Sequence, residues 1–398
     1  MRLLLLALLA TSAVAAQDSG FTVVFPPYVT PYLPLSTDAV AVAEAGAFGR
    51  TDDPLRMLDN PAVLADFADG VTLSGHVLPE WLGLGGDYRS AGGAIAGGLR
   101  TRLGGLPTSV GVGLAYGSFT SPNYATAGVE GEFVPVPPFR EDRDQVVALG
   151  VGVGVEGPVR VRVGAAGRSL RSVPLLPAPT FIGDAERAHA LVADLGVDVT
   201  APVGQWIQGA PSDDGVRAIL DVSLGYAVRG LAISGEAPAG YLSTPGHQPS
   251  AGVALLVGAE VGARSATPLR VAEAEFLTGA EDPGAAAFGL SAANVFLGSD
   301  PSDQALVRRA GRLTLGETLT LSRGSMAGGS LVARDGWGVA VSAGGALRLA
   351  GAVAGRPDLS RLGERLDLRY TYAAYTFEPG ESPFGGTPTH GLVLRVRP

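Results

Sequence analysis

Apolar side chains recur at every second position along much of this chain. In the clearest run, from Val147 to Val155, valine or leucine alternates with alanine or glycine. Comparable runs lie at 110–116, 159–163, 191–200, 220–228, 313–321 and 392–397. Because successive side chains of a β-strand point to opposite faces, this period predicts strands with one apolar face and one small or polar face.

The composition favours a membrane barrel over a soluble β-sandwich, although both are built from half-apolar strands. Charged residues make up 17% of the chain, whereas soluble domains carry about 25%. Beyond the first residues no apolar run approaches the roughly 20 residues of a spanning helix. The polar faces are rich in Gly, Ala, Ser and Thr, with scattered charges that suit a lumen. The lumen-lining candidates are Arg160, Arg162, Asp194, Asp198, Asp221, Asp367, Arg369 and Arg395.

The connections between the runs differ in length, as they do in outer-membrane barrels. A tight turn is expected at 156–158, and long loops rich in proline and polar residues at 120–144 and 172–188. The segment 201–215 would then be a long periplasmic connection. We therefore expect an all-β fold, a transmembrane antiparallel β-barrel of about 14 strands with a short N-terminal plug or hatch.

Residues 1–16 are typical of a cleavable signal peptide. Arg2 precedes an apolar run from Leu3 to Ala10, and small residues end the segment at Ala16. The apolar run is too short to span a membrane. With cleavage before Gln17, the chain divides into a signal peptide (1–16), a plug or hatch segment (17–69) and the barrel (70–398). The expected location is the outer membrane of a Gram-negative-type envelope, with membrane lipid around the barrel.

The N-terminal segment lacks the alternation of the rest of the chain. A small-residue stretch ends at Gly46, an Asp-Asp-Pro turn follows at 52–54, and an Asn-Pro pair at 60–61 interrupts the local structure. Such a segment before a barrel is expected to lie at its periplasmic mouth or to plug part of its lumen.

The stretch from Tyr32 to Ala65 resembles the N-terminal signature of the PorV/PorQ family of outer-membrane proteins, within the broader FadL-like barrel superfamily. The last strand, in which Thr389 and His390 precede alternating apolar residues, resembles the family as well. Asp59 departs from the pattern, because the family has an aromatic residue there, and the chain also ends without a terminal aromatic residue. The matching positions are Asp38, Ala39, Gly46, Asp52, Asp53, Asn60, Pro61, Ala62 and Ala65.

The resemblance implies a barrel that serves type IX protein secretion or cargo attachment at the cell surface. Its partners would then be the secretion machinery and exported cargo proteins. A FadL-like channel for uptake of hydrophobic small molecules is the alternative, and a structural surface barrel is a third. A lipophilic lumen with a lateral strand kink would favour the channel. Large extracellular loops that form a protein-sized groove would favour secretion.

Residue types that carry enzyme chemistry are absent or scattered. The chain has no cysteine, and its four histidines share no metal-ligand spacing. Glycines between Gly150 and Gly154 fall inside an alternating run with no helix after it, so they do not form a dinucleotide-binding loop. A net charge of −9 argues against nucleic acid as a partner. We expect no enzymatic activity, no cofactor and no metal.

Overall fold

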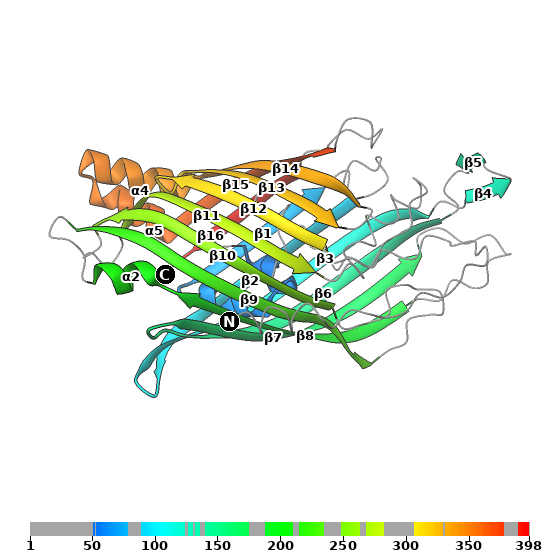
Figure 1. The fold of residues 1–398 in the computed structure, drawn as a ribbon, viewed down its shortest axis with the longest axis horizontal. Helices are drawn as coiled ribbons and strands as arrows, with labels where there is room; N and C mark the ends of the chain where they lie inside the picture. The colour runs from blue at the N-terminus through cyan, green and yellow to red at the C-terminus, as the bar shows by residue number, and fades with distance from the viewer. Residues whose placement is uncertain are drawn as a thin grey trace.

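The computed structural model describes residues 51, 53–78, 89–123, 126–129, 132–135, 140–174, 188–209, 215–234, 248–262, 268–281, 306–328, 331–377 and 389–397. The signal peptide and the motif residues Asp38, Ala39, Gly46 and Asp52 lie outside these residues. The described chain forms a long barrel whose axis is horizontal in Figure 1.

Fourteen of the described strands form one closed antiparallel barrel. It closes where Val71 of β1 pairs with Val396 of β16. Two further strands, β4 (Thr126–Val129) and β5 (Glu132–Pro135), form a separate small sheet. The all-β fold and the expected number of barrel strands are confirmed. The barrel strands are β1 (Val71–Leu78), β2 (Arg89–Leu103), β3 (Leu106–Asn123), β6 (Arg140–Val155), β7 (Arg160–Pro174), β8 (Ala188–Ala201), β9 (Val216–Ser234), β10 (Gln248–Val261), β11 (Leu269–Glu281), β12 (Leu306–Leu315), β13 (Leu319–Gly328), β14 (Leu331–Ser342), β15 (Leu366–Phe377) and β16 (Thr389–Val396).

Side chains alternate between the two faces of the barrel wall, as the period of the sequence requires. On β6, Leu149 is 66% exposed, whereas its neighbour Ala148 is fully buried. Outward positions of the other strands likewise carry exposed Val, Leu, Ile, Phe and Tyr, and inward positions carry mainly small, polar or paired charged residues. An apolar outer surface around such an interior is the arrangement of a barrel that spans a membrane.

The two ends of the barrel differ in their connections. At the end where β1 begins, most turns are short, but α2 (Val203–Gln208) follows β8, and α4 (Ala343–Ala354) and α5 (Pro357–Arg365) follow β14. At the other end every connection except 329–330 has ten or more residues. Because outer-membrane barrels have their short turns on the periplasmic side, we call the first end periplasmic and the second extracellular.

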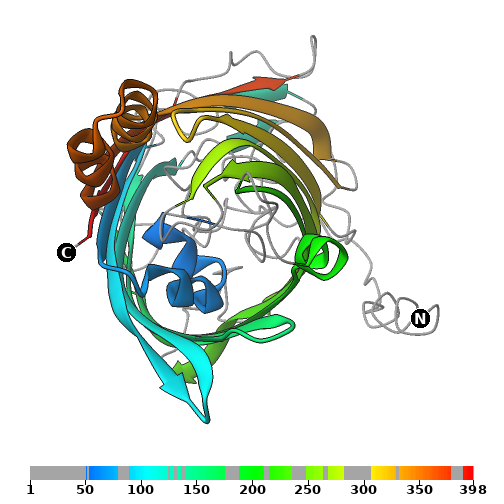
Figure 2. The same ribbon diagram turned by 90° about the vertical axis from the view of Figure 1, so that its left-hand side faces the viewer.

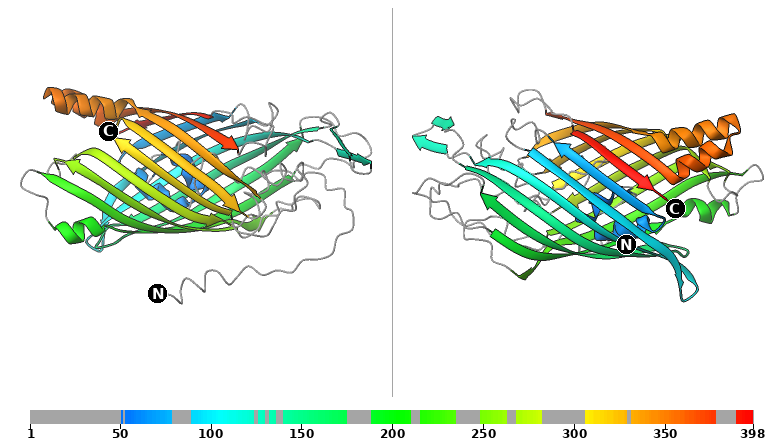
Figure 3. Two further views of the ribbon diagram at one scale, coloured as in Figure 1. Left: turned by 45° about the horizontal axis from the view of Figure 1, so that its top comes forward. Right: turned by 180° about the vertical axis from the view of Figure 1, so that it is seen from behind.

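The hairpin of α4 and α5 lies within 70–398, the range that the sequence analysis assigned to the barrel of an all-β fold. Figure 3 shows the two helices extending past the ends of the neighbouring strands. Five alanines and two leucines favour a helix at α4, although its three glycines oppose one. The Ser342 Oγ atom caps the helix by accepting a hydrogen bond from the N–H of Gly345 at 2.8 Å. No helix among the described residues is long and apolar enough to cross a membrane.

Residues 53–69 form a plug inside the barrel. It contains two short 3-10 helices, η1 (Pro54–Leu58) and η2 (Pro61–Phe67), which lie against one side of the wall in the end-on view of Figure 2. The second helix packs on β3, β6, β7 and β8. Leu55, Leu58 and Leu64 are fully buried. The plug therefore fills the part of the lumen next to β2, β3 and β6 to β8. The part of the lumen next to β10 to β16 lies on the opposite side of the barrel.

An arginine on the outer face should cost far more at mid-barrel than beside a periplasmic turn. We expect Leu149→Arg to lower the free energy of unfolding by about 2–4 kcal/mol, because its charge would face hydrocarbon. Leu103 is equally exposed but adjoins the turn at Gly104, so Leu103→Arg should cost less than about 1 kcal/mol. Urea titration of the barrel in lipid vesicles measures both values. Equal costs would contradict a membrane-facing surface at Leu149.

Candidate functional site

Two Asx-Pro steps start the two helices of the plug. The Asp53 Oδ1 atom accepts a hydrogen bond from the N–H of Leu55 at 3.0 Å. The Asn60 Oδ1 atom accepts one from the N–H of Ala62, also at 3.0 Å. In each case proline is the first helical residue, where its missing N–H costs nothing and its fixed φ suits the helix. The Asn-Pro pair therefore ends η1 and begins η2 within the lumen.

Glycines on the wall let η2 approach the strands at backbone distance. A Cβ atom at Gly111 would overlap the carbonyl group of Leu64, and one at Gly164 would overlap the backbone of Pro61. Backbone atoms of the plug cannot rotate away as a flexible side chain can, so the plug fits here only against glycine. We call this surface the glycine seat, and its members are Gly111, Gly152, Gly164 and Gly196.

Arg168 of β7 joins the plug to the wall from a fully buried position. Its guanidinium donates hydrogen bonds to the carbonyl oxygen of Leu58 in the plug and to the carboxylate of Asp194 on β8. Asp194 also accepts a hydrogen bond from the N–H of Gly230 at 3.0 Å. Gly230 has a φ of 74° and lies where the pairing of β8 and β9 shifts register. One wall carboxylate thus orients the arginine and holds the β9 bulge.

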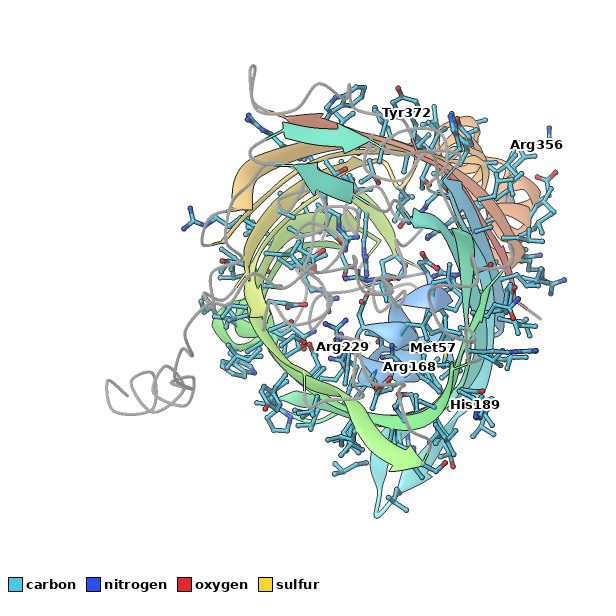
Figure 4. The ribbon with its side chains drawn as sticks, turned by 90° about the vertical axis from the view of Figure 1, so that its right-hand side faces the viewer. Met57, Arg168, His189, Arg229, Arg356 and Tyr372 are labelled. Atoms are coloured by element: carbon cyan, nitrogen blue, oxygen red, sulfur yellow. The ribbon has the colours of Figure 1, made fainter. Side chains whose placement is uncertain are left out.

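Asp59 of the plug lies between two arginines. It accepts a hydrogen bond from Arg56 Nη1 at 2.9 Å, and Arg229 Nη1 of β9 lies 3.5 Å from its other oxygen. All three side chains are buried. Figure 4 shows Arg229 and Arg168 close to Met57 inside the barrel. The departure from the family pattern at position 59 therefore provides a buried carboxylate that ties the plug to β9.

A second buried arginine, Arg162 of β7, makes a similar bridge nearer the periplasmic end. Its Nη2 atom lies 2.6 Å from Asp198 Oδ1 on β8, and its Nη1 atom donates to Asp66 of the plug. Arg160 approaches the same plug carboxylate at 3.9 Å. Arg162 and Arg168 each have one carboxylate partner on the wall and one oxygen partner on the plug.

The wall carboxylates determine whether Arg162 and Arg168 keep a counter-charge when the plug moves. Removing one partner of a buried ion pair costs about 3–5 kcal/mol, because the remaining charge has no counter-charge. Displacing the plug, however, leaves Arg162 paired with Asp198 and Arg168 paired with Asp194. The arrangement can therefore hold the plug in place and also release it without isolating either guanidinium.

A polar cavity of about 500 Å³ lies on the periplasmic side of the plug. Its lining combines arginines and carboxylates from the plug, the strand ends and α4. Several of its charges are paired, including Arg270 with Glu273 at 2.8 Å. Among the described residues, no group of three or more His, Asp or Glu side chains is arranged to hold a metal ion. A neighbouring cavity of about 220 Å³ includes Asp221 in its lining.

Apolar residues line the lumen nearer the extracellular end. On β7, β8, β10, β11, β12, β15 and β16, a buried Ala, Leu or Val lies closer to that end than a charged lumen residue of the same strand. On β2, β3 and β6, wall residues form one buried cluster with Leu55, Met57 and Leu64 of the plug. We call this set the apolar lining, and its wall members are Ala94, Ala115, Val146, Leu170, Val192, Leu256, Leu277, Ala310, Ala373 and Val393.

The sequence-predicted residues fall into three groups in the structure. Asp53, Asn60, Pro61, Ala62 and Ala65 build the plug, whereas Asp38, Gly46 and Asp52 lie outside the described residues. Asp194 and Asp198 are buried partners of wall arginines. The remaining lumen candidates line the two cavities, namely Arg160, Arg162, Asp221, Asp367, Arg369 and Arg395.

Sequence reasoning missed four residues that tie the plug in place. Arg168 has the same phase on β7 as Arg160 and Arg162, so the period of two already indicated its lumen position. The other three carried no such signal, because the plug lacks a period and Arg229 adjoins an irregular step of β9. The four missed residues are Asp59, Asp66, Arg168 and Arg229.

No model of a known protein family matches the sequence, and no curated protein matches it. Solved structures with a similar fold include the toluene transporter TodX of P. putida, with 11% identity, 90% of this chain and 98% of that chain covered, and a TM-score of 0.36. The β domain of the Bordetella autotransporter BrkA shares 10% identity with this chain and has a TM-score of 0.32. The match covers 83% of this chain and 99% of that chain. A mutant of the Rh. blastica porin shares 9% identity with this chain and has a TM-score of 0.29. The match covers 82% of this chain and 98% of that chain. These low values place the chain in none of the three groups.

The buried pair of Arg168 and Asp194 should be strongly coupled. We expect Arg168→Met and Asp194→Asn each to lower the free energy of unfolding by about 3–5 kcal/mol, and the double variant to cost clearly less than the sum. The exposed plug–wall pair Arg100–Asp69, at 2.6 Å, is the matched control, with an expected cost below about 1 kcal/mol for either single change. Urea unfolding in vesicles measures all variants. Additive costs at Arg168 and Asp194 would show that the two side chains do not act as a pair.

A side chain in the glycine seat should displace the plug while the barrel stays closed. We expect Gly164→Leu to raise the ion conductance of the barrel in planar bilayers several-fold, because the plug backbone must move away from the wall. Gly167 lies on the same strand, faces outward, and has no atom within 4 Å of a Cβ built on it. Gly167→Leu should therefore leave the conductance unchanged. The same low conductance for both folded variants would mean that the plug does not depend on the seat.

Proposed function

We propose that this protein is an outer-membrane channel for uptake of hydrophobic small molecules, gated by the plug at 53–69. The chain would reach the membrane by export, with residues 1–16 removed before Gln17. The barrel would lie in outer-membrane lipid with its long connections outside the cell. Movement of the plug would then open a path from the extracellular half of the lumen to the periplasmic cavity.

The apolar lining is the observation that carries this proposal. Apolar molecules gain about 25 cal/mol per Å² on leaving water for such a surface, whereas charged solutes lose hydration there. The lining lies nearer the extracellular end than the charged cavity, so a molecule that enters from outside reaches the lining before the cavity. A lumen made only to exclude solutes has no need of an apolar lining above a charged cavity.

The paired wall arginines support the role of the plug as a gate. With Asp194 and Asp198 as permanent partners, Arg168 and Arg162 remain compensated when the plug is displaced. The bulge of β9 at Gly230 adds a strand irregularity beside the plug, and a kink of this kind is where a channel for hydrophobic molecules would open sideways to lipid. Both features suit a plug that moves during transport.

The other two functions stay as predictions. Type IX secretion or cargo attachment, with secretion machinery and cargo proteins as partners, depends on a groove formed by extracellular loops. Most of those connections lie outside the described residues, so no described feature favours that role. A structural surface barrel would need neither the apolar lining nor a movable plug.

Locking the plug with a disulfide tests the proposed function directly, because the chain has no cysteine of its own. A Cβ built at Gly154 of the wall lies 3.2 Å from the Cβ of Ala65 in the plug, close to the about 3.8 Å of a disulfide. We expect cells of a Gram-negative host to take up the hydrophobic dye N-phenyl-1-naphthylamine faster with the wild-type protein than with an empty vector. The oxidised Ala65→Cys/Gly154→Cys variant should fall to the vector rate, and reduction should restore uptake.

A second disulfide controls for the effect of the bond itself. Val253 of β10 and Thr278 of β11 face each other across the two strands on the outward side, so Val253→Cys/Thr278→Cys joins two wall strands and leaves the plug free. This variant should keep wild-type uptake when oxidised. Wild-type uptake equal to the vector would refute the channel function, and equal uptake by the locked and unlocked plug would refute gating.

A further inference from the structure

Helix α4 exposes an unusually apolar surface for a helix at the end of a barrel. All of its exposed residues are alanine, leucine or valine, and Val353 is 81% exposed. Its one charged residue, Arg348, instead lines the polar cavity of the lumen. The helix therefore has a polar side toward the lumen and an apolar side away from it, which is the same division that the barrel strands have.

The hairpin of α4 and α5 is fixed to the barrel. Arg348 donates hydrogen bonds to Glu317, in the turn between β12 and β13, and to the carbonyl oxygen of Pro268 at 3.0 Å. Glu317 in turn accepts one from the N–H of Arg270 at 3.0 Å. The two helices pack closely because Gly363 of α5 leaves no room for a Cβ beside α4. The apolar surface of α4 is thus held in a fixed place relative to the wall.

The strands next to the hairpin are too short to cover the membrane. A barrel needs an outer apolar band about 25 Å tall, and a strand tilted by about 40° rises about 2.6 Å per residue along the axis. On β9, the outward apolar residues from Val216 to Tyr226 span about 26 Å. On β14, those from Trp337 to Val341 span only about 10 Å. Exposed Arg323 ends the band on neighbouring β13.

Helix α4 supplies the missing height. It has 12 residues, which span about 18 Å at 1.5 Å per residue. It runs roughly along the barrel axis and reaches about as far toward the periplasmic end as β9 does (Figure 1). Added to the outward face of β14, it gives a band of about 28 Å, close to the height required.

We propose that the α4–α5 hairpin is part of the membrane-facing wall and that the apolar side of α4 contacts the acyl chains of the periplasmic leaflet. The occupant of this surface is lipid, since the surface continues the outer apolar band of β14. The polar groups of the hairpin are of the kind expected at the membrane surface, where lipid headgroups meet water. Arg356 and Asp358 form an exposed ion pair at 2.7 Å where the two helices meet, and Arg361 of α5 is exposed with a long stem that reaches phosphate groups.

Single cysteines on opposite sides of α4 test this proposal. The fluorescent label bimane is attached to Val353→Cys, on the apolar side, or to Ala352→Cys, which lies one turn from Arg348 on the lumen side. Leu149→Cys is the lipid-facing reference. In vesicles of phosphatidylethanolamine and phosphatidylglycerol, we expect spin-labelled lipid to quench the labels at 353 and 149 at least three-fold more than the label at 352. Aqueous iodide should show the opposite order.

Two results would overturn the proposal. Iodide quenching at 353 equal to that at 352 would place the hairpin in water. Protection of 353 from both iodide and spin-labelled lipid would mean that protein covers the surface, such as a second copy of this chain. The inference depends on membrane insertion but not on transport. Lipid quenching at Leu149 reports insertion separately, and dye uptake reports transport, so the failure of one proposal is distinguishable from the failure of the other.

Discussion

Arg162 and Arg168 stand inside the barrel wall with a carboxylate partner on the adjacent strand and a further oxygen partner on the plug. A buried guanidinium requires a counter-charge, and here the wall itself provides it through Asp198 and Asp194. At these two arginines the plug therefore adds contacts to charges that are already neutralised, whereas at Arg229 the plug supplies a carboxylate, Asp59. This constraint lets the same network determine where the plug lies and allow its departure.

The remainder of the lumen follows from how the plug is seated. Wall glycines bring η2 to backbone distance on one side, so the ion pairs form at short range. Many of the charges lie in and below the plug, and buried alanine, leucine and valine lie nearer the extracellular end on most of the described strands. On the outside, the same alternation yields an apolar surface whose height differs around the barrel. Next to the hairpin, the outward apolar face of β14 is short, and the apolar side of α4 adds the height that this face lacks.

The sequence predicts the fold far better than the site. Side-chain direction is a local property of a strand, so a period of two was sufficient for the all-β barrel and its strand number. The same period singled out Arg162 and Asp198 as lumen candidates. Their pairing depends on the register of β7 against β8, which no local pattern encodes. Asp59 and Asp66 belong to a segment without a period. The hairpin at 343–365 was missed because alternation cannot be read in a run of Ala, Gly and Leu.

The most direct test of a releasable plug is its position relative to the wall, measured by pulsed electron paramagnetic resonance. Spin labels on Thr51→Cys, two residues before the plug, and Gly157→Cys, in an exposed periplasmic turn, report this distance in a chain with no native cysteine. A releasable plug predicts one distance in the protein alone and a second, longer distance when N-phenyl-1-naphthylamine is added. A single unchanged distance while the dye still enters cells would contradict it.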